Sequence, residues 1–167
     1  MKLEYAFLLT APLQIWAASI PFYKQSPLTT LEEQFPVKGD NPLGYCNDPK
    51  DDILEITSVN LSPNPPEPGQ TLTIEAEGTF HEPVERGSKI HLEVKYGLIK
   101  LIKTDADLCD EIEANTDLKC PLQGKQKFVK QVDIPSQVPP GKYAVLADVY
   151  TKDDERVTCL QARDIVF

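Results

Sequence analysis

Strict alternation of apolar and polar side chains is the feature that most constrains this chain. It runs through TLTIEAEGTF at 71–80, KIHLEVKYG at 89–97 and KYAVLADVY at 142–150. A period of two buries one face of an extended strand and leaves the other face in water. These segments are therefore predicted to be β-strands that each line one side of a core.

Similar stretches predict further strands at 53–61, 127–134 and 157–167. Turn-forming segments separate the predicted strands. They read SPNPPEPGQ, HEPVERGS and PSQVPPGK. Six or seven short strands with this punctuation predict an all-β fold, an immunoglobulin-like β-sandwich of two antiparallel sheets.

The stretch LIKLI, directly after Gly97, breaks the alternation and places apolar side chains on both faces. Two interpretations stay open. One is a glycine bulge followed by a strand buried on both sides. The other is that Leu98, Ile99, Leu101 and Ile102 line an apolar cavity or its mouth.

The N-terminal region predicts processing. Residues 1–19 show a lysine, an apolar run and small residues ahead of a cleavage site after Ser19, the order of a secretory signal peptide. Residues 20–38 have three prolines and no clear period, which predicts a pro-segment or a disordered arm. The folded domain then spans 39–167. We expect the protein to be secreted or to reach a vacuolar or lysosome-like lumen.

Charge and motifs exclude several function classes. A formal net charge of -9 argues against nucleic-acid binding, which needs a basic surplus. The chain has no G-x-S-x-G and no H-E-x-x-H, and His81 precedes Glu82 in a turn-like segment, so we expect no catalysis and no cofactor. The four cysteines include no C-x2-C pair, which is the spacing typical of zinc sites, so we expect no metal site. Nothing demands an oligomer, and we expect a monomer.

Four cysteines in an oxidising compartment predict two disulfides, with three possible pairings. Asn60 begins an N-glycosylation sequon, but Pro63 directly after that sequon disfavours its use.

An ordered set of motifs resembles the ML family of secreted lipid-recognition proteins. The set is Cys46, VNLSP at 59–63, KYGLIKLI at 95–102, the loop from Cys109 to Cys120, CPLQGKQKFVKQVDIP at 120–135, and Cys159 in the last strand. Within this family the chain looks most similar to the fungal phosphatidylglycerol/phosphatidylinositol transfer proteins. The family also includes the Niemann-Pick type C cholesterol-binding protein.

The resemblance implies that the two sheets splay apart around an apolar cavity for one lipid. It implies disulfides Cys46–Cys159 and Cys109–Cys120, and a Cys109–Cys120 loop at the open end would fix the rim. It places the mouth and cavity near Leu101, Ile102, Val138 and Pro139. Further candidates for the lipid-binding wall are apolar strand positions. They are Phe80, Tyr96, Leu98, Leu122, Phe128 and Val132.

The expected function is intermembrane transfer of phosphatidylglycerol and phosphatidylinositol, with sterol as a further possible ligand. The alternative is an immunoglobulin-like interaction module with a filled core and no lipid. Four lysines lie between Leu118 and Val132, a segment without acidic residues. They are Lys119, Lys125, Lys127 and Lys130. One hypothesis is that they contact anionic membranes or a lipid headgroup; the other is that they guard an edge strand against aggregation.

Overall fold

The computed structural model of this chain describes residues 35–167. The signal peptide predicted over 1–19 and most of the segment predicted over 20–38 lie outside the described residues. The end of that second segment belongs to the fold, because Phe35–Pro36 form a short strand, β1, and Val37 is buried.

The described residues form nine strands, one α-helix and a 3-10 turn at Pro49–Asp51. The elements after β1 are β2 Leu43–Tyr45, β3 Leu54–Ser62, β4 Thr71–Val84, β5 Lys89–Tyr96, β6 Ile99–Asp107, α1 Leu108–Asn115, β7 Leu122–Asp133, β8 Lys142–Tyr150 and β9 Arg156–Val166.

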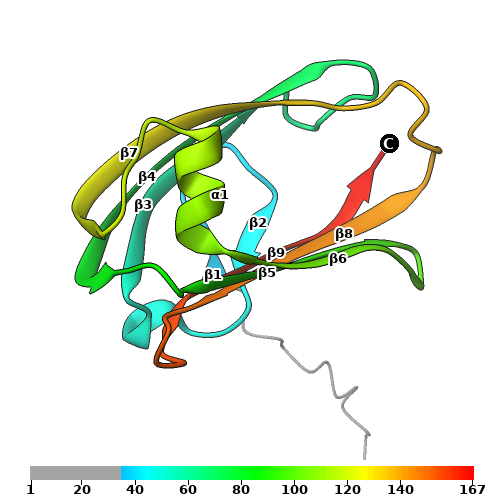
Figure 1. The fold of residues 1–167 in the computed structure, drawn as a ribbon. Coiled ribbons are helices and arrows are strands. Elements are labelled where there is room, and N and C mark those ends of the chain that lie inside the picture. Colours follow the sequence, from blue (N-terminus) through cyan, green and yellow to red (C-terminus); the bar gives the residue numbers. More distant parts are fainter. Residues whose placement is uncertain (1–34) are drawn as a thin grey trace, which may run out of the picture. The chain divides into compact units, whose positions relative to one another are not determined.

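Two antiparallel sheets make up the fold. The larger sheet has the strand order β1-β2-β9-β8-β5-β6, and the smaller has the order β3-β4-β7. Figure 1 shows the sheets layered against each other, with α1 beside them at one end. The predicted all-β sandwich of two antiparallel sheets is confirmed. Within residues 35–167, no helix has the length and apolar character needed to cross a membrane.

The strand limits differ from the prediction in several places. β7 begins at Leu122 rather than at 127. β4 continues to Val84 through a segment predicted to be a turn, because Val84 is fully buried in the core. β1 and β2 were missed, since strands of two and three residues are too short to show a period.

The segment between Cys109 and Cys120, predicted to be a loop, begins with α1. The Asp107 carboxylate caps this helix by accepting hydrogen bonds from the N–H groups of Cys109 and Asp110, at 2.8 and 3.2 Å. Acidic residues in the first turn also suit the positive end of the helix dipole. An eight-residue helix with a weak apolar stripe is hard to see in the sequence.

A cluster of buried apolar side chains fills the end of the sandwich beside α1, which we call the closed end. Its members are Ile53, Val84, Leu108, Leu122, Val149 and Val157. Helix α1 contributes Leu108 and packs Ile112 against the cluster. The opposite end, where β5 turns into β6 and β7 leaves its sheet, is called the open end.

Both disulfides implied by the family resemblance are present. Cys46–Cys159 closes a sequence separation of 113 residues, and Cys109–Cys120 closes one of 11. Cys159 lies in β9, so the long disulfide joins the segment after β2 to the larger sheet.

Candidate functional site

The side chains that face the space between the sheets follow from strand register. On β4, Phe80 packs against the closed-end core, so alternate residues back to Leu72 share this inner face. Residues paired directly across a ladder lie on the same face. The β7 residues on the inner face are Gln126, Phe128, Lys130 and Val132.

The larger sheet presents an apolar inner face. Ile90 of β5 packs against the core, which places alternate residues as far as Tyr96 on the same side. Register extends this face onto the neighbouring strands. Its members there are Tyr143, Val145 and Ala147 of β8 and Ile102, Thr104 and Ala106 of β6.

On the edge strands β6 and β7, exposure of these apolar side chains rises from the closed end to the open end, whereas Tyr143 on β8 stays buried. Leu122 is 1% exposed and Val149 is 7% exposed, whereas Val132 is 37% and Ile102 is 48% exposed. A well-packed sandwich buries such side chains throughout its core. The uncovered apolar surface therefore lies toward the open end, and exposed apolar surface of this kind is typical of binding surfaces.

The turn between β5 and β6 is strongly apolar, and we call residues 97–102 the hairpin tip. Leu98 is fully exposed, and Ile99 and Leu101 are more than half exposed. The interpretation of LIKLI as a strand buried on both sides is therefore wrong. The bulge lies at Leu101 rather than at Gly97, because Ile102 pairs with Val94 and Lys100 pairs with Lys95.

An ion-pair cluster fixes the base of the hairpin tip on the outer face of the sheet. Lys95 and Lys100 are paired directly across the ladder and would repel each other. The Glu93 carboxylate accepts from both ammonium groups, at 2.8 Å from Lys100 and 2.7 Å from Lys95. Hydrogen bonds from Lys100 and then Lys95 lower the pKa of Glu93 to about 2.

An aromatic cluster holds the loop between β7 and β8 against the open end. The ring of Tyr143 lies 5.1 Å from that of Tyr96 and 5.2 Å from that of Phe167. The hydroxyls of Tyr143 and Tyr96 donate to the carbonyls of Pro139 and Pro140, at 2.9 and 3.2 Å. Burial raises the pKa of Tyr143, so its hydroxyl stays a donor.

The predicted wall residues divide between the two ends of the sandwich. Tyr96, Ile102, Phe128 and Val132 face inward on strands that run to the open end. Val138 and Pro139 lie in the adjoining loop, half-buried and exposed respectively. Leu101 and Leu98 belong to the hairpin tip.

Two predicted wall residues lie at the closed end instead. Leu122 is a member of the buried core cluster, and Phe80 packs against that cluster. Their position leaves them within packed protein rather than beside the uncovered apolar surface.

The four lysines do not form one patch. Lys125 and Lys127 lie on the outer face of β7 beside Glu77, and the Lys125 ammonium contacts that carboxylate at 2.6 Å. Hydrogen bonding to Lys125 lowers the pKa of Glu77. Lys119 is exposed in the segment after α1, whereas Lys130 is half-buried on the inner face.

The Cys109–Cys120 disulfide supports the closed end, not the open rim that was expected. Cys109 is fully buried next to Leu108, and Cys120 packs against the core cluster. The expectation was wrong because the sequence does not show that β6 and β7 bring this segment to the same end as Val84 and Leu122.

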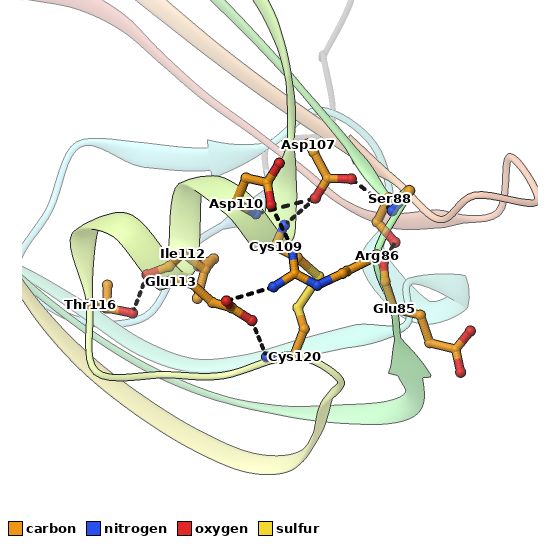
Figure 2. Close-up of a disulfide and its surroundings, with 11 residues drawn as sticks. Glu85, Arg86, Ser88, Asp107, Cys109, Asp110, Ile112, Glu113, Thr116 and Cys120 are labelled. Atoms are coloured by element: carbon orange, nitrogen blue, oxygen red, sulfur yellow. Dashed lines mark hydrogen bonds and ion pairs between the residues drawn. A yellow bond between two sulfur atoms is a disulfide. The ribbon is translucent and has the colours of Figure 1, made fainter.

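Polar contacts reinforce this end, as Figure 2 shows. The Arg86 guanidinium reaches Asp110 and Glu113, at 2.6 Å each. The other oxygen of Glu113 accepts from the Cys120 N–H at 3.2 Å. That backbone hydrogen bond, opposed by burial and assisted by Arg86, lowers the pKa of Glu113.

Sequence reasoning missed Tyr143, Phe167, Leu72 and Ile74 as residues of the open end. Alternation in TLTIEAEGTF and KYAVLADVY did mark Leu72, Ile74 and Tyr143 as inward-facing. Their place at the open end follows only from the pairing of Leu72 with Val132 and of Tyr143 with Tyr96.

A separate surface pocket of about 970 Å³ lies on β1, β2 and β9. Asn41, Asp48 and Arg163 are among its lining residues, and it contains none of the predicted lipid-binding positions. Within residues 35–167, no group of three or more His, Cys, Asp or Glu is placed to hold a metal ion.

Comparison with known proteins gives consistent matches over nearly the whole chain. The ML domain family model matches residues 40–164. A phosphatidylglycerol/phosphatidylinositol transfer protein from Aspergillus fumigatus is 57% identical over 162 residues, which cover 96% of this chain and 92% of that protein. The protein of the same description from Emericella nidulans is 52% identical, and the match covers 97% of this chain and 95% of that protein.

Among solved structures, one similarity reaches a TM-score above 0.5 and supports the fold. Chicken MD-1 complexed with lipid IVa has a TM-score of 0.53 and 13% identity, covering 80% of this chain and 97% of that chain. A Niemann-Pick type C2 protein from Japanese carpenter ant has a TM-score of 0.48 and 13% identity, over 77% of this chain and 96% of its own.

Proposed function

This chain belongs to the ML-domain family, and from that premise we propose that it carries phosphatidylglycerol and phosphatidylinositol between membranes. Transfer of this kind makes and breaks no covalent bond. The protein has only to extract a lipid, shield its acyl chains from water and release it at another membrane, so we propose binding without catalysis.

One observation carries the proposal: the inner faces of both sheets are mostly apolar, yet on the edge strands β6 and β7 they stay uncovered toward the open end. Val132 and Ile102 on facing edge strands are more than a third exposed although both point inward. Acyl chains placed between the sheets would cover these side chains. Each buried CH2 contributes about 0.8 kcal/mol, which offsets much of the cost of leaving a bilayer.

The hairpin tip provides the contact with the membrane. Leu98, Ile99 and Leu101 protrude beside the open end, and their transfer into the interfacial region of a bilayer is favourable. Lys103, which follows the tip, can meet anionic headgroups at the surface. In this arrangement the open end faces the bilayer while a lipid enters or leaves.

We propose that the protein works outside the cytosol, in the lumen of the secretory pathway or after secretion. Two disulfides persist where the compartment is oxidising. The signal peptide predicted for residues 1–19 would deliver the chain there. The pro-segment predicted over 20–38 belongs to the same proposal.

The proposal is tested by identifying what the purified protein carries. Native mass spectrometry followed by organic extraction should show a single bound phosphatidylglycerol or phosphatidylinositol, and labelled lipid should move between vesicles when the protein is added. A bound sterol instead would change the ligand class. An empty protein that takes up nothing from mixed vesicles would favour the interaction module with a filled core.

A matched pair of variants ties transfer to the inner face. Val132→Asp places a charge between the sheets, whereas Val129→Asp places the same charge on the outer face of the same strand, at a side chain 51% exposed. We expect Val132→Asp to lower transfer about tenfold or more, because a carboxylate among acyl chains is costly to bury even when it pairs with the neighbouring Lys130. Val129→Asp should transfer like the wild type, and equal losses in both variants would count against the site.

A further inference from the structure

Lys130 differs in position from every other charged residue in the strand ladders. It pairs with Ile74 on the inner face, and its inner-face neighbours along β7 are Phe128 and Val132. Among the paired strand positions of residues 35–167, Lys130 is the single charged side chain on the inner faces. Its place in the sandwich therefore calls for an explanation.

Four other strand lysines, Lys95, Lys100, Lys125 and Lys142, meet carboxylates on outer faces, and the rest, Lys89, Lys103 and Lys127, also lie on outer faces. Lys125 contacts Glu77 at 2.6 Å, and Lys142 contacts Asp164 at 2.9 Å. The side chain of Lys130, on the inner face, makes no hydrogen bond or ion pair with any residue that the structure describes. Lys130 is half-buried as a residue, and its side chain has apolar neighbours and no counter-ion, so a fitting anion would bind its ammonium favourably.

The depth of Lys130 in the sandwich suits a headgroup rather than an acyl chain. Lys130 lies one inner-face position inward of Val132, whose side chain is 37% exposed at the open end. A lysine stem can lie along apolar surface while its ammonium reaches toward water. An ammonium at this level would meet the phosphate of a lipid whose chains extend toward the closed end.

We propose that Lys130 binds the headgroup phosphate and makes the protein select anionic phospholipids over zwitterionic ones. A charge-assisted hydrogen bond between ammonium and phosphate is strong where water is partly excluded. Phosphatidylcholine also has a phosphate, but its choline cation would find no carboxylate at the paired inner-face positions of the described strands. This inference rests on the proposed function and adds the residue that sets the preference among lipid headgroups.

The experiment measures headgroup preference at constant membrane charge. Donor vesicles of phosphatidylcholine carry a trace of labelled phosphatidylglycerol or of labelled phosphatidylcholine, and the ratio of the two transfer rates is determined. Wild type should favour phosphatidylglycerol. Lys130→Gln should lower the ratio about tenfold or more, as loss of one charge-assisted hydrogen bond predicts. Lys130→Arg, which keeps the charge, should retain the preference.

Lys127→Gln is the matched control, because it removes a charge from the outer face of the same strand. It should leave the ratio unchanged. The inference is overturned if Lys130→Gln keeps the wild-type ratio, or if it slows both lipids equally. A wild-type protein that transfers neither lipid would instead overturn the proposed function, so the two failures are distinguishable.

Discussion

At the scale of single residues, Asp107 joins β6, α1 and the turn before β5. Its carboxylate accepts from the N–H groups of Cys109 and Asp110 at the start of α1, and from the Gly87 N–H at 2.7 Å. Burial opposes ionisation, but the Gly87, Asp110 and Cys109 donors outweigh it and lower the pKa of Asp107. The ionised form is therefore the one that stabilises the fold.

Asp107→Ala should reduce the free energy of unfolding by about 1–2 kcal/mol near neutral pH, the usual loss for a helix N-cap. Because the folded state lowers this pKa, the contribution is complete above the unfolded pKa of about 3.9 and is lost as pH falls through the folded value. The gap between wild type and variant should therefore narrow below about pH 4. Urea unfolding of wild type and variant, at neutral pH and below about pH 4, measures the difference in unfolding free energy.

Asp117→Ala serves as the control, since Asp117 is exposed just beyond α1 and its side chain has no hydrogen bond among those of the described residues. That variant should unfold like the wild type at both pH values. A gap for Asp107→Ala that stayed constant on acidification would contradict the role given to its ionised carboxylate.

At the scale of elements, the hairpin tip combines exposed apolar side chains with a firmly held base. Glu93 holds Lys95 and Lys100 on the outer face, and its pKa of about 2 keeps this cluster ionised through the physiological range. The space around Gly97 at the start of the tip is open, since a Cβ added there would have no other residue's atom within 4 Å apart from its chain neighbours. Strand pairing thus presents the apolar residues without burying them.

Leu98→Asp should weaken association with phospholipid vesicles about tenfold, because burying one leucine side chain is worth about 1.5–3 kcal/mol. It should leave thermal stability unchanged, since the Leu98 side chain is fully exposed. Vesicle flotation with the purified protein measures the association. The same result for Val129→Asp would show a general effect of added negative charge rather than a role for the hairpin tip.

At the scale of the whole molecule, the Cys109–Cys120 disulfide and the buried apolar core lie at the closed end rather than at the open end. The Cys109–Cys120 disulfide, α1 and the core cluster together hold the closed end. The open end has the exposed inner-face side chains and the aromatic cluster around Tyr143. Regions with few buried contacts open at lower free energy, so we expect the sheets to part at the open end before the rest of the fold unfolds.

Removing the long disulfide should destabilise the protein more than removing the short one. In the chain-entropy model, separations of 113 and 11 residues correspond to about 5 and 3 kcal/mol of unfolding free energy. Cys46→Ser/Cys159→Ser should thus unfold at lower denaturant concentration than Cys109→Ser/Cys120→Ser. The opposite order would show that local packing around α1, rather than loop closure, dominates.

The sequence by itself determined the all-β class and most strands, because alternation with a period of two is a local property that one buried face imposes. Motif order likewise sufficed to place the chain in its family, and the inward positions of Tyr96, Phe128 and Val132 follow from their strands. The family also supplied both disulfide pairings, which cysteine spacing alone left open.

Only the tertiary structure decided which inward-facing residues are covered and which are not. Leu122 and Val132 lie on one strand and look alike in sequence, yet one is in the core and the other lies at the open end. Lys130 shares a face with Phe128 and Val132 by strand alternation, but its depth between the sheets follows only from its pairing with Ile74, while Lys125 and Lys127 lie outside. Burial and charge pairing depend on register between strands distant in sequence, which no local pattern encodes.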